Sequence, residues 1–202
     1  MIAIIDYGVG NLFSLKSSFA AIGEETVVTS SPEVIKSADK LVLPGVGAFG
    51  DAVIKLEASG LIPLIKEQVN SGKPLMGICL GMQLLFETSE EYGAHVGLGV
   101  LKGKIVGMEG RIRDDLKIPH IGWNSLRIKR ENPLLKYVKE GDCVYFVHSF
   151  YAEACDESLI ATTDYGVEIT AAVASANVYG CQFHPEKSGE VGLGILRAFS
   201  EL

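Results

Sequence analysis

Short apolar segments alternate with helix-periodic segments through the first half of the 202-residue chain, and this alternation limits the possible folds. Each apolar segment has the length and composition of a buried strand, and each is followed by apolar residues at helical spacing. Strands that alternate with helices predict a parallel sheet covered by helices on both faces, and therefore an α/β fold. The predicted strands are 2–6, 26–29, 40–44 and 74–78, and the predicted helices are 12–22, one starting at Pro32, 51–58, 61–70 and 80–88.

The second half of the chain has a different character. From about 99 to 182 it is rich in strand signals and in Gly and Asn, and a last helix is predicted at 189–201. The clearest strands there are 144–147, 169–173 and 178–182. No Pro/Ser-rich linker, internal repeat or low-complexity tract interrupts the chain, so residues 1–202 are expected to form one domain.

Charge and cysteine usage exclude several classes of protein. The net charge is −7 and no cluster of Lys or Arg occurs, which argues against a nucleic-acid-binding protein. The N-terminal apolar stretch ends at Asp6, too early for a signal peptide or a membrane span. A cytoplasmic protein with reduced thiols and no membrane association is therefore expected. The cysteines are widely spaced and form no CxxC pair: Cys79, Cys143, Cys155 and Cys181.

Cys79 has the sequence context of a nucleophile. A strand ends at this residue, a helix begins directly after it, and Gly77 and Gly81 flank it in the pattern G-x-C-x-G. Small neighbours allow the sharp turn of a nucleophile elbow, and a helix N-terminus stabilises a thiolate. The alternative is a buried structural cysteine, which an isolated cysteine usually is. The two glycines and the change from strand to helix favour the nucleophile.

His184 and Glu186 supply the base and the orienting carboxylate that a thiol nucleophile needs. They stand in the segment His-Pro-Glu, directly after the predicted strand 178–182. An isolated histidine usually packs in the core or lies on the surface. In a chain that already has an elbow cysteine, this segment favours a catalytic base held by its neighbouring carboxylate.

Backbone N–H groups at the end of the third strand can form an oxyanion hole. The glycine-rich loop 44–50 ends a parallel strand, as Cys79 does, so both lie at the carboxyl edge of the sheet, where ligands bind. The expected donors to a developing oxyanion are the N–H groups of Val46, Gly47 and Leu80.

The same loop also contains the spacing of a dinucleotide-binding fingerprint at Gly45, Gly47 and Gly50. That fingerprint belongs to a first βα turn and needs an acidic residue at the end of the next strand. Here Glu67 stands at the corresponding distance inside a predicted helix, which disfavours a nucleotide site. No zinc-binding or paired-cysteine motif occurs either, so neither a metal nor a cofactor is expected.

Six sequence blocks carry a family resemblance that covers nearly the whole chain. G-I-C-L-G-M-Q-L-L-F, P-G-V-G-A-F and Q-F-H-P-E-K-S together resemble the class I (triad) glutamine amidotransferases. More narrowly, I-D-Y-G-V-G-N-L, P-H-I-G-W-N and Y-F-V-H-S-F are similar to the glutaminase subunits of imidazole glycerol phosphate synthase. The resemblance implies a mixed, largely parallel sheet with a flavodoxin-like core, flanked by helices and carrying an added antiparallel layer.

The resemblance also implies roles for individual residues. Cys79 would be the nucleophile, His184 the general acid and base, and Glu186 its orienter. Phe150 replaces a tyrosine of the family pattern, so a hydroxyl contact there is not carried over. For Trp123, core packing is an equally good interpretation. The implied glutamine-binding residues are Gly45, Gln83, Glu91, Ser149 and Phe150, and the implied partner-facing residues are Asn11, His120, Trp123 and Lys187.

The implied reaction is hydrolysis of glutamine to glutamate and ammonia through a thioester on Cys79. The ammonia would pass to a separate cyclase subunit, the second chain of a heterodimer, which makes imidazole glycerol phosphate in histidine biosynthesis. One alternative is the amidotransferase subunit of another synthase, serving anthranilate, aminodeoxychorismate or pyridoxal phosphate synthesis. The other is a catalytically silent binding protein of the same fold.

Overall fold

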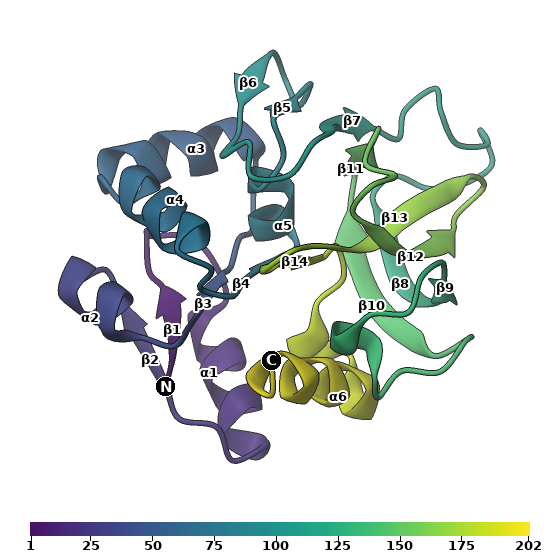
Figure 1. Ribbon diagram of the computed structural model, residues 1–202. Coiled ribbons are helices and arrows are strands. Elements are labelled where there is room, and N and C mark those ends of the chain that lie inside the picture. Colours follow the sequence, from purple (N-terminus) through teal and green to yellow (C-terminus); the bar gives the residue numbers. More distant parts are fainter.

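An eight-stranded sheet forms the centre of the computed structural model, which describes all 202 residues (Figure 1). The first five strands of its order are mutually parallel, and the last three continue the sheet antiparallel. The predicted α/β class and the largely parallel sheet are confirmed. The order is β2 (Thr26–Thr29), β1 (Ile2–Ile5), β3 (Lys40–Leu43), β4 (Leu75–Ile78), β14 (Val178–Cys181), β13 (Glu168–Ser175), β12 (Leu159–Asp164) and β9 (Arg127–Ile128).

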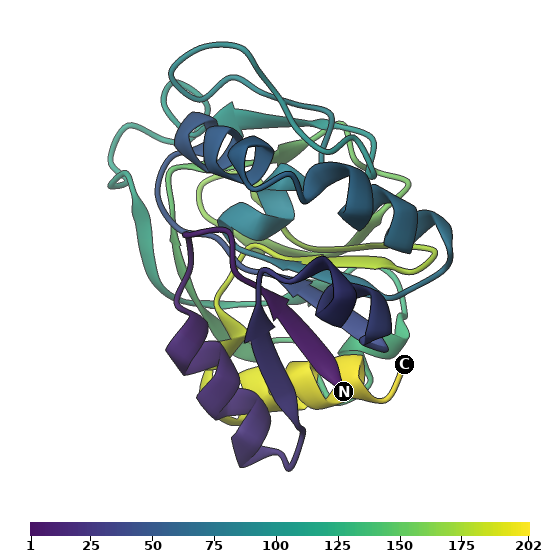
Figure 2. The ribbon, with the colours of Figure 1, turned by 90° about the vertical axis from the view of Figure 1, so that its left-hand side faces the viewer.

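Helices cover both faces of this sheet, as Figure 2 shows from the side. In β1, Ala3 and Ile5 pack into the core on one face, and Ile2 and Ile4 pack into the core on the other. This alternation explains why the parallel strands are apolar along their whole length. The first face carries α2 (Pro32–Ser37), α3 (Phe49–Ala58) and α4 (Ile62–Asn70), and the second carries α1 (Leu12–Ala21) and α6 (Gly189–Ser200). None of the helices has the length and apolar composition needed to cross a membrane.

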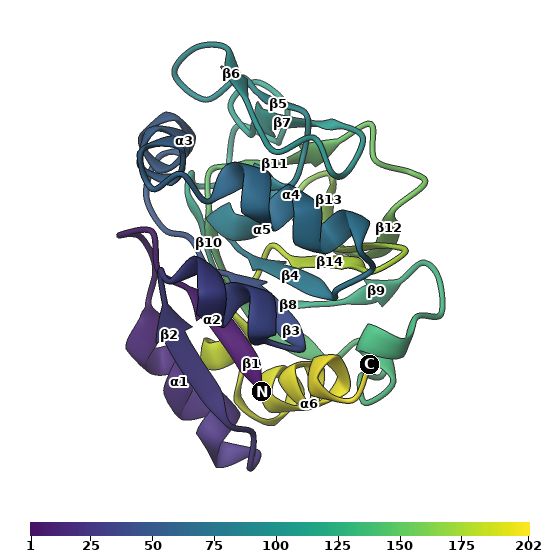
Figure 3. The same cartoon turned by 60° about the vertical axis from the view of Figure 1, so that its left-hand side comes forward.

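Two smaller sheets form the added layer (Figure 3). One is an antiparallel ribbon, and the other has four strands, of which only the β5–β7 pair is parallel. The added layer expected from the family resemblance is therefore present. The ribbon consists of β8 (His120–Ser125) and β10 (Cys143–His148), and the four-stranded sheet of β11 (Phe150–Glu153), β7 (Lys104–Gly107), β5 (Thr88–Ser89) and β6 (His95–Val96). Two single turns of 3₁₀ helix are η1 (Pro133–Leu135) and η2 (Pro185–Lys187).

The helix after Cys79 is shorter than predicted. It is α5 (Leu80–Leu84), whereas the sequence predicts 80–88. Two carbonyls that would continue the helix accept hydrogen bonds from a distant loop instead: Leu84 O from Leu98 N (2.8 Å) and Leu85 O from Val100 N (2.9 Å). The predicted length was wrong because a non-local partner ends the helix.

Helix α3 begins two residues earlier than predicted, at Phe49. Its first N–H group donates to Glu91 Oε2 at 2.9 Å. A carboxylate at this position satisfies one of the unpaired N–H groups of a helix start. Because Glu91 lies 42 positions away, no local capping signal marked this boundary.

Glycines let α5 pack directly against the end of β3. A Cβ atom on Gly81 would lie 1.9 Å from Leu43 O, and one on Gly45 would lie 2.6 Å from the Gly81 nitrogen. Real Cβ atoms do not approach backbone this closely, so both positions require glycine. The contact sets the distance between the loop after β3 and the start of α5.

The substitution Gly81→Ala tests this contact. We expect the free energy of unfolding to fall by about 1–3 kcal/mol or more, because the added methyl group meets backbone that cannot move aside. Urea unfolding measures the change, with Ser17→Ala on the exposed side of α1 as a control expected to stay within about 0.5 kcal/mol of the parent. Equal stability of the Gly81→Ala variant and the parent would contradict the tight contact.

Candidate active site

Cys79 occupies a strained turn between β4 and α5. Its φ and ψ are 54° and −114°, a conformation that costs a non-glycine residue free energy and is found mainly at functional sites. Its N–H donates to Cys181 O (2.7 Å) and its carbonyl accepts from Gln83 N (3.1 Å), which hold the backbone in place. The residue is 7% exposed and lines a cavity. The N–H groups at the start of α5 have no intrahelical acceptor and favour negative charge at this position.

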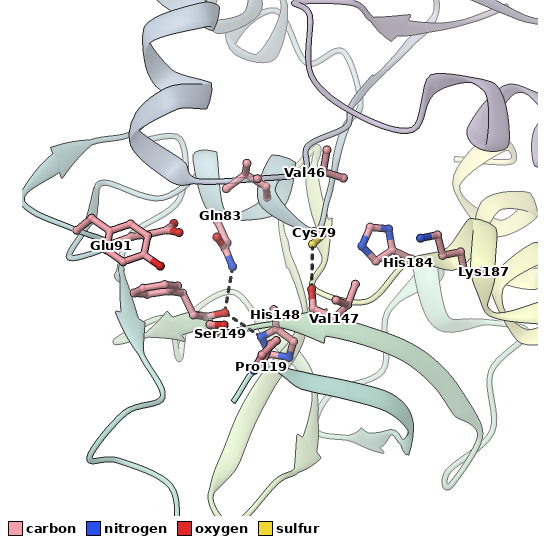
Figure 4. Close-up of a pocket in the computed structure, with 14 residues that line it drawn as sticks. Val46, Cys79, Gln83, Glu91, Pro119, Val147, His148, Ser149, His184 and Lys187 are labelled. Atoms are coloured by element: carbon pink, nitrogen blue, oxygen red, sulfur yellow. Dashed lines mark hydrogen bonds between the residues drawn. The ribbon is translucent and has the colours of Figure 1, made fainter. Parts of the chain in front are cut away.

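The cavity has a volume of about 410 Å³, which suits a small polar ligand. Figure 4 shows Cys79 in its centre, with Gln83 on one side and His184 on the other. Most of the residues expected at the site line it: Val46, Gly47, Cys79, Leu80, Gln83, Glu91, Ser149, Phe150, His184 and Lys187. Four lining residues are absent from the predicted site: Tyr92, Pro119, Val147 and His148.

His184 and Glu186 form a buried hydrogen-bonded pair. The Nδ1–H group of His184 donates to Glu186 Oε1 at 2.8 Å, and both side chains are nearly inaccessible to solvent. Burial by itself lowers the pKa of His184, but its interactions with Cys79 and Glu186 outweigh burial and raise that pKa to about 9. His184 therefore carries a proton at neutral pH beside the Cys79 sulfur. A neighbouring imidazolium is one of the features that activate catalytic cysteines.

The loop after β3 contributes Val46 and Gly47 to the lining of the cavity. Tyr7 fixes its start by donating from its hydroxyl to Pro44 O (2.8 Å), and burial keeps that hydroxyl protonated by raising the pKa of Tyr7. Gly47 has a φ of 91°, which only glycine adopts freely. Val46, Gly47 and Leu80 all line the cavity, so the residues of the expected oxyanion donors lie around the same space as Cys79.

Gly45 does not line the cavity. Its α-carbon packs against Leu80 and Gly81, where a Cβ atom would lie 2.8 Å from Leu80 Cβ. Close packing therefore explains why this position is a glycine, and no contact with glutamine is needed for that explanation.

The opposite end of the cavity is polar. Gln83 donates from Nε2 to Phe150 O and to Gln182 Oε1, both at 3.0 Å, which leaves the Gln83 carbonyl oxygen free to accept. Glu91 uses one oxygen to cap α3, and burial raises the pKa of this carboxyl, partly offset by the hydrogen bond from Phe49. Tyr92 packs edge-on against Phe150, with a centroid distance of 5.9 Å. This end is suited to the charged end of an amino acid.

The residues expected to face a partner do not form one group. Asn11 caps α1 by accepting from Ser14 N (3.3 Å), and Trp123 is 54% exposed, so core packing does not account for it. Lys187 lies over the Tyr145 ring at the edge of the cavity.

His120, in contrast, is fully buried, so its side chain cannot touch a partner directly. Its Nδ1 lies 3.1 Å from His148 Nε2, and its ring stacks on Phe146 and Tyr165. A role for His120 at an interface remains a prediction, and it would have to act through neighbouring residues. No cluster of three or more His, Cys, Asp or Glu side chains in the structure could hold a metal ion.

Comparison with known proteins identifies the family. The family model described as "Glutamine amidotransferase class-I" matches residues 3–200, and the chain belongs to that family. Its relatives include "Imidazole glycerol phosphate synthase subunit HisH" of Sulfurimonas denitrificans, 52% identical over 100% of this chain and 98% of that protein. The protein of the same name from Caldanaerobacter subterraneus subsp. tengcongensis is 50% identical over 100% of this chain and 98% of its own length.

Solved structures of low sequence identity share the fold. A structure described as "Crystal structure of glutamine amidotransferase" aligns with a TM-score of 0.76 at 17% identity, covering 99% of this chain and 100% of that one. PurLQS from Thermotoga maritima aligns with a TM-score of 0.74 at 19% identity, covering 99% and 97% of the two chains.

His148 makes stability depend on pH. The pKa of His148 falls from 6.5 to about 3, mainly because the side chain is buried. Between these pH values the unfolded chain therefore binds more protons than the folded protein. The contribution of His148 to stability is full above pH 6.5 and is lost as the pH falls toward 3. In His148→Asn, the free energy of unfolding should therefore fall less steeply from pH 6.5 to 4.5 than in the parent, by up to about 1.4 kcal/mol per pH unit. Urea unfolding at several pH values measures the slopes, and equal slopes would contradict the assignment.

Proposed function

We propose that this chain hydrolyses glutamine to glutamate and ammonia through a γ-glutamyl thioester on Cys79. The observation that carries the proposal is the strained Cys79 in a small polar cavity, beside a buried His184 that Glu186 holds at 2.8 Å. Nucleophile, base and orienter are the three parts that thiol-based acyl transfer needs. Membership of the class I glutamine amidotransferase family supports the same chemistry.

The reaction proceeds in two halves. The Cys79 thiolate attacks the γ-carboxamide carbon of glutamine, and the oxyanion that forms accepts hydrogen bonds from N–H groups among Val46, Gly47 and Leu80. Protonated His184 gives its proton to the leaving nitrogen, and ammonia departs. Neutral His184 then takes a proton from water, whose oxygen attacks the thioester carbon, and glutamate leaves with the thiolate restored.

We propose further that the ammonia passes to a separate cyclase subunit, which makes imidazole glycerol phosphate in histidine biosynthesis. Relatives of about 50% identity over the full chain are named as subunits of that synthase, which supports this choice over the other synthases. Asn11, Trp123 and Lys187 are the residues proposed to lie on the partner side. The cytoplasm is the proposed compartment, because Cys79 must remain a free thiol to act.

The substitution Cys79→Ala tests the function in the complex with the cyclase. Glutamine-dependent synthesis should be lost, because no other side chain can carry the thioester. Synthesis from added ammonium should persist, because that route bypasses Cys79. Cys143→Ala is the matched control, since Cys143 is an exposed cysteine outside the cavity, and it should keep both activities. Glutamine-dependent synthesis by the Cys79→Ala complex would refute the nucleophile.

Substitutions of His184 and Glu186 distinguish the role of the base from that of the residue that orients it. His184→Ala should lower glutamine hydrolysis by a factor of about 10²–10⁴, the range expected when general acid–base help is lost. Glu186→Gln should lower it less, because the amide oxygen can still accept the hydrogen bond from His184 Nδ1 although it carries no charge. Steady-state kinetics of both variants in the complex measure the difference. A smaller effect for His184→Ala than for Glu186→Gln would reverse the proposed roles.

A further inference from the structure

The carbonyl of Phe150 fixes the direction of a buried hydrogen-bond chain. A backbone carbonyl can only accept, and this one receives Gln83 Nε2 at 3.0 Å and His148 Nδ1 at 2.8 Å. Gln83 must therefore turn its NH₂ group toward Phe150, and His148 must carry its proton on Nδ1.

The orientation of the Gln83 amide in turn fixes the orientation of the Gln182 amide. The second N–H of Gln83 points at the Gln182 side chain, which must meet it with its oxygen, and the Nε2···Oε1 distance is 3.0 Å. The Gln182 amide nitrogen then has one direction left, toward Cys79 Sγ, which lies 3.8 Å away. Both glutamines are buried, Gln182 completely, so water does not compete for these contacts.

We propose that Gln182 is a further catalytic residue, whose amide N–H donates to the Cys79 sulfur and stabilises its thiolate. The inference rests on the proposed nucleophile. A hydrogen bond to the charged form of a group favours that form. Unlike His184, an amide donor does not give up its proton in the reaction, so it is available to the thiolate before the attack and again when the thiolate is restored.

The other neighbours of the sulfur make this donor important. The Cys79 thiol can donate to Val147 O, 3.9 Å away, and that carbonyl disfavours the thiolate because it presents only lone pairs. Figure 4 shows this carbonyl below Cys79, joined to the sulfur by a dashed line. Gln182 is thus a neutral donor that offsets an acceptor facing the nucleophile.

Packing alone does not require an amide at this position. An apolar side chain of similar size would fill the space without the cost of burying a polar group, and that cost is offset only where hydrogen bonds are made. His148 belongs to the same arrangement as a positioning residue, because it holds the Phe150 carbonyl that orients Gln83. Because His148 carries its proton on Nδ1, its Nε2 accepts from His120 Nδ1–H, 3.1 Å away.

The test measures alkylation of Cys79 by iodoacetamide between pH 5 and 9, in the full chain with Cys143→Ala to remove the exposed thiol. In Gln182→Leu the apparent pKa of alkylation should rise by about one unit, and the rate at pH values below it should fall about tenfold. The rate at the high-pH plateau should be retained, because the thiolate remains accessible. An unchanged pH profile would overturn the proposal.

Two further variants separate a hydrogen-bonding role from a structural one. Gln182→Glu keeps the shape and the oxygen that Gln83 needs but cannot donate to a thiolate when ionised, so its apparent pKa should rise by at least as much. Gln68→Leu removes a buried glutamine of α4 that is remote from the cavity, and it should leave the profile unchanged. A normal profile in Gln182→Glu, or an equal shift in Gln68→Leu, would count against Gln182. The assay needs neither glutamine nor partner, so it remains readable if the proposed glutaminase reaction fails.

Discussion

The close backbone contact between the end of β3 and the start of α5 is the constraint on which the site depends. It brings the loop that contains Val46 and Gly47 beside the first turn of the helix that begins after Cys79. A side chain at Gly45 or Gly81 would push these two elements apart. The residues proposed to supply the oxyanion donors would then no longer line the same cavity. These two glycines are therefore needed because they let the two elements pack closely, and backbone flexibility is a secondary reason.

The elements that surround Cys79 hold it in its strained conformation. A positive φ at a non-glycine residue costs on the order of 1–3 kcal/mol, and the surrounding structure must offset it. Here two neighbouring strands, a helix and the Cys79 N–H···O Cys181 bond of 2.7 Å hold the turn from all sides. The elements themselves are stabilised by two large apolar cores, which can offset the cost of this conformation.

The sequence predicted those parts of the structure whose signals are local. The strand–cysteine–helix junction and the His-Pro-Glu segment each occupy a few consecutive residues, and both lie where their patterns indicate, although their roles remain predictions. Gln182 and His148 stand in two of the blocks that carry the resemblance, but no role was assigned to them, because their partners are remote: Gln182 lies 99 positions from Gln83. The early end of α5 and the capping of α3 by Glu91 were missed for the same reason. The burial of His120 could not be predicted from the sequence either. The segment 120–125 contains a glycine and an exposed tryptophan, so it has no clear alternation of apolar and polar residues.

The ribbon of β8 and β10 connects the outer surface of the molecule to the reacting residues. Its register pairs Tyr145 with Trp123 and His148 with His120, so that the exposed tryptophan and the buried histidines alternate along the same two strands. The β10 strand also holds the segment that starts at His184, because Tyr145 O accepts from His184 N at 3.0 Å. The ribbon whose exposed side carries Trp123 therefore also positions His184 and carries His148, which donates to the Phe150 carbonyl. Since that carbonyl orients Gln83 and, through it, Gln182, the ribbon and Cys79 are linked by hydrogen bonds as well as by packing.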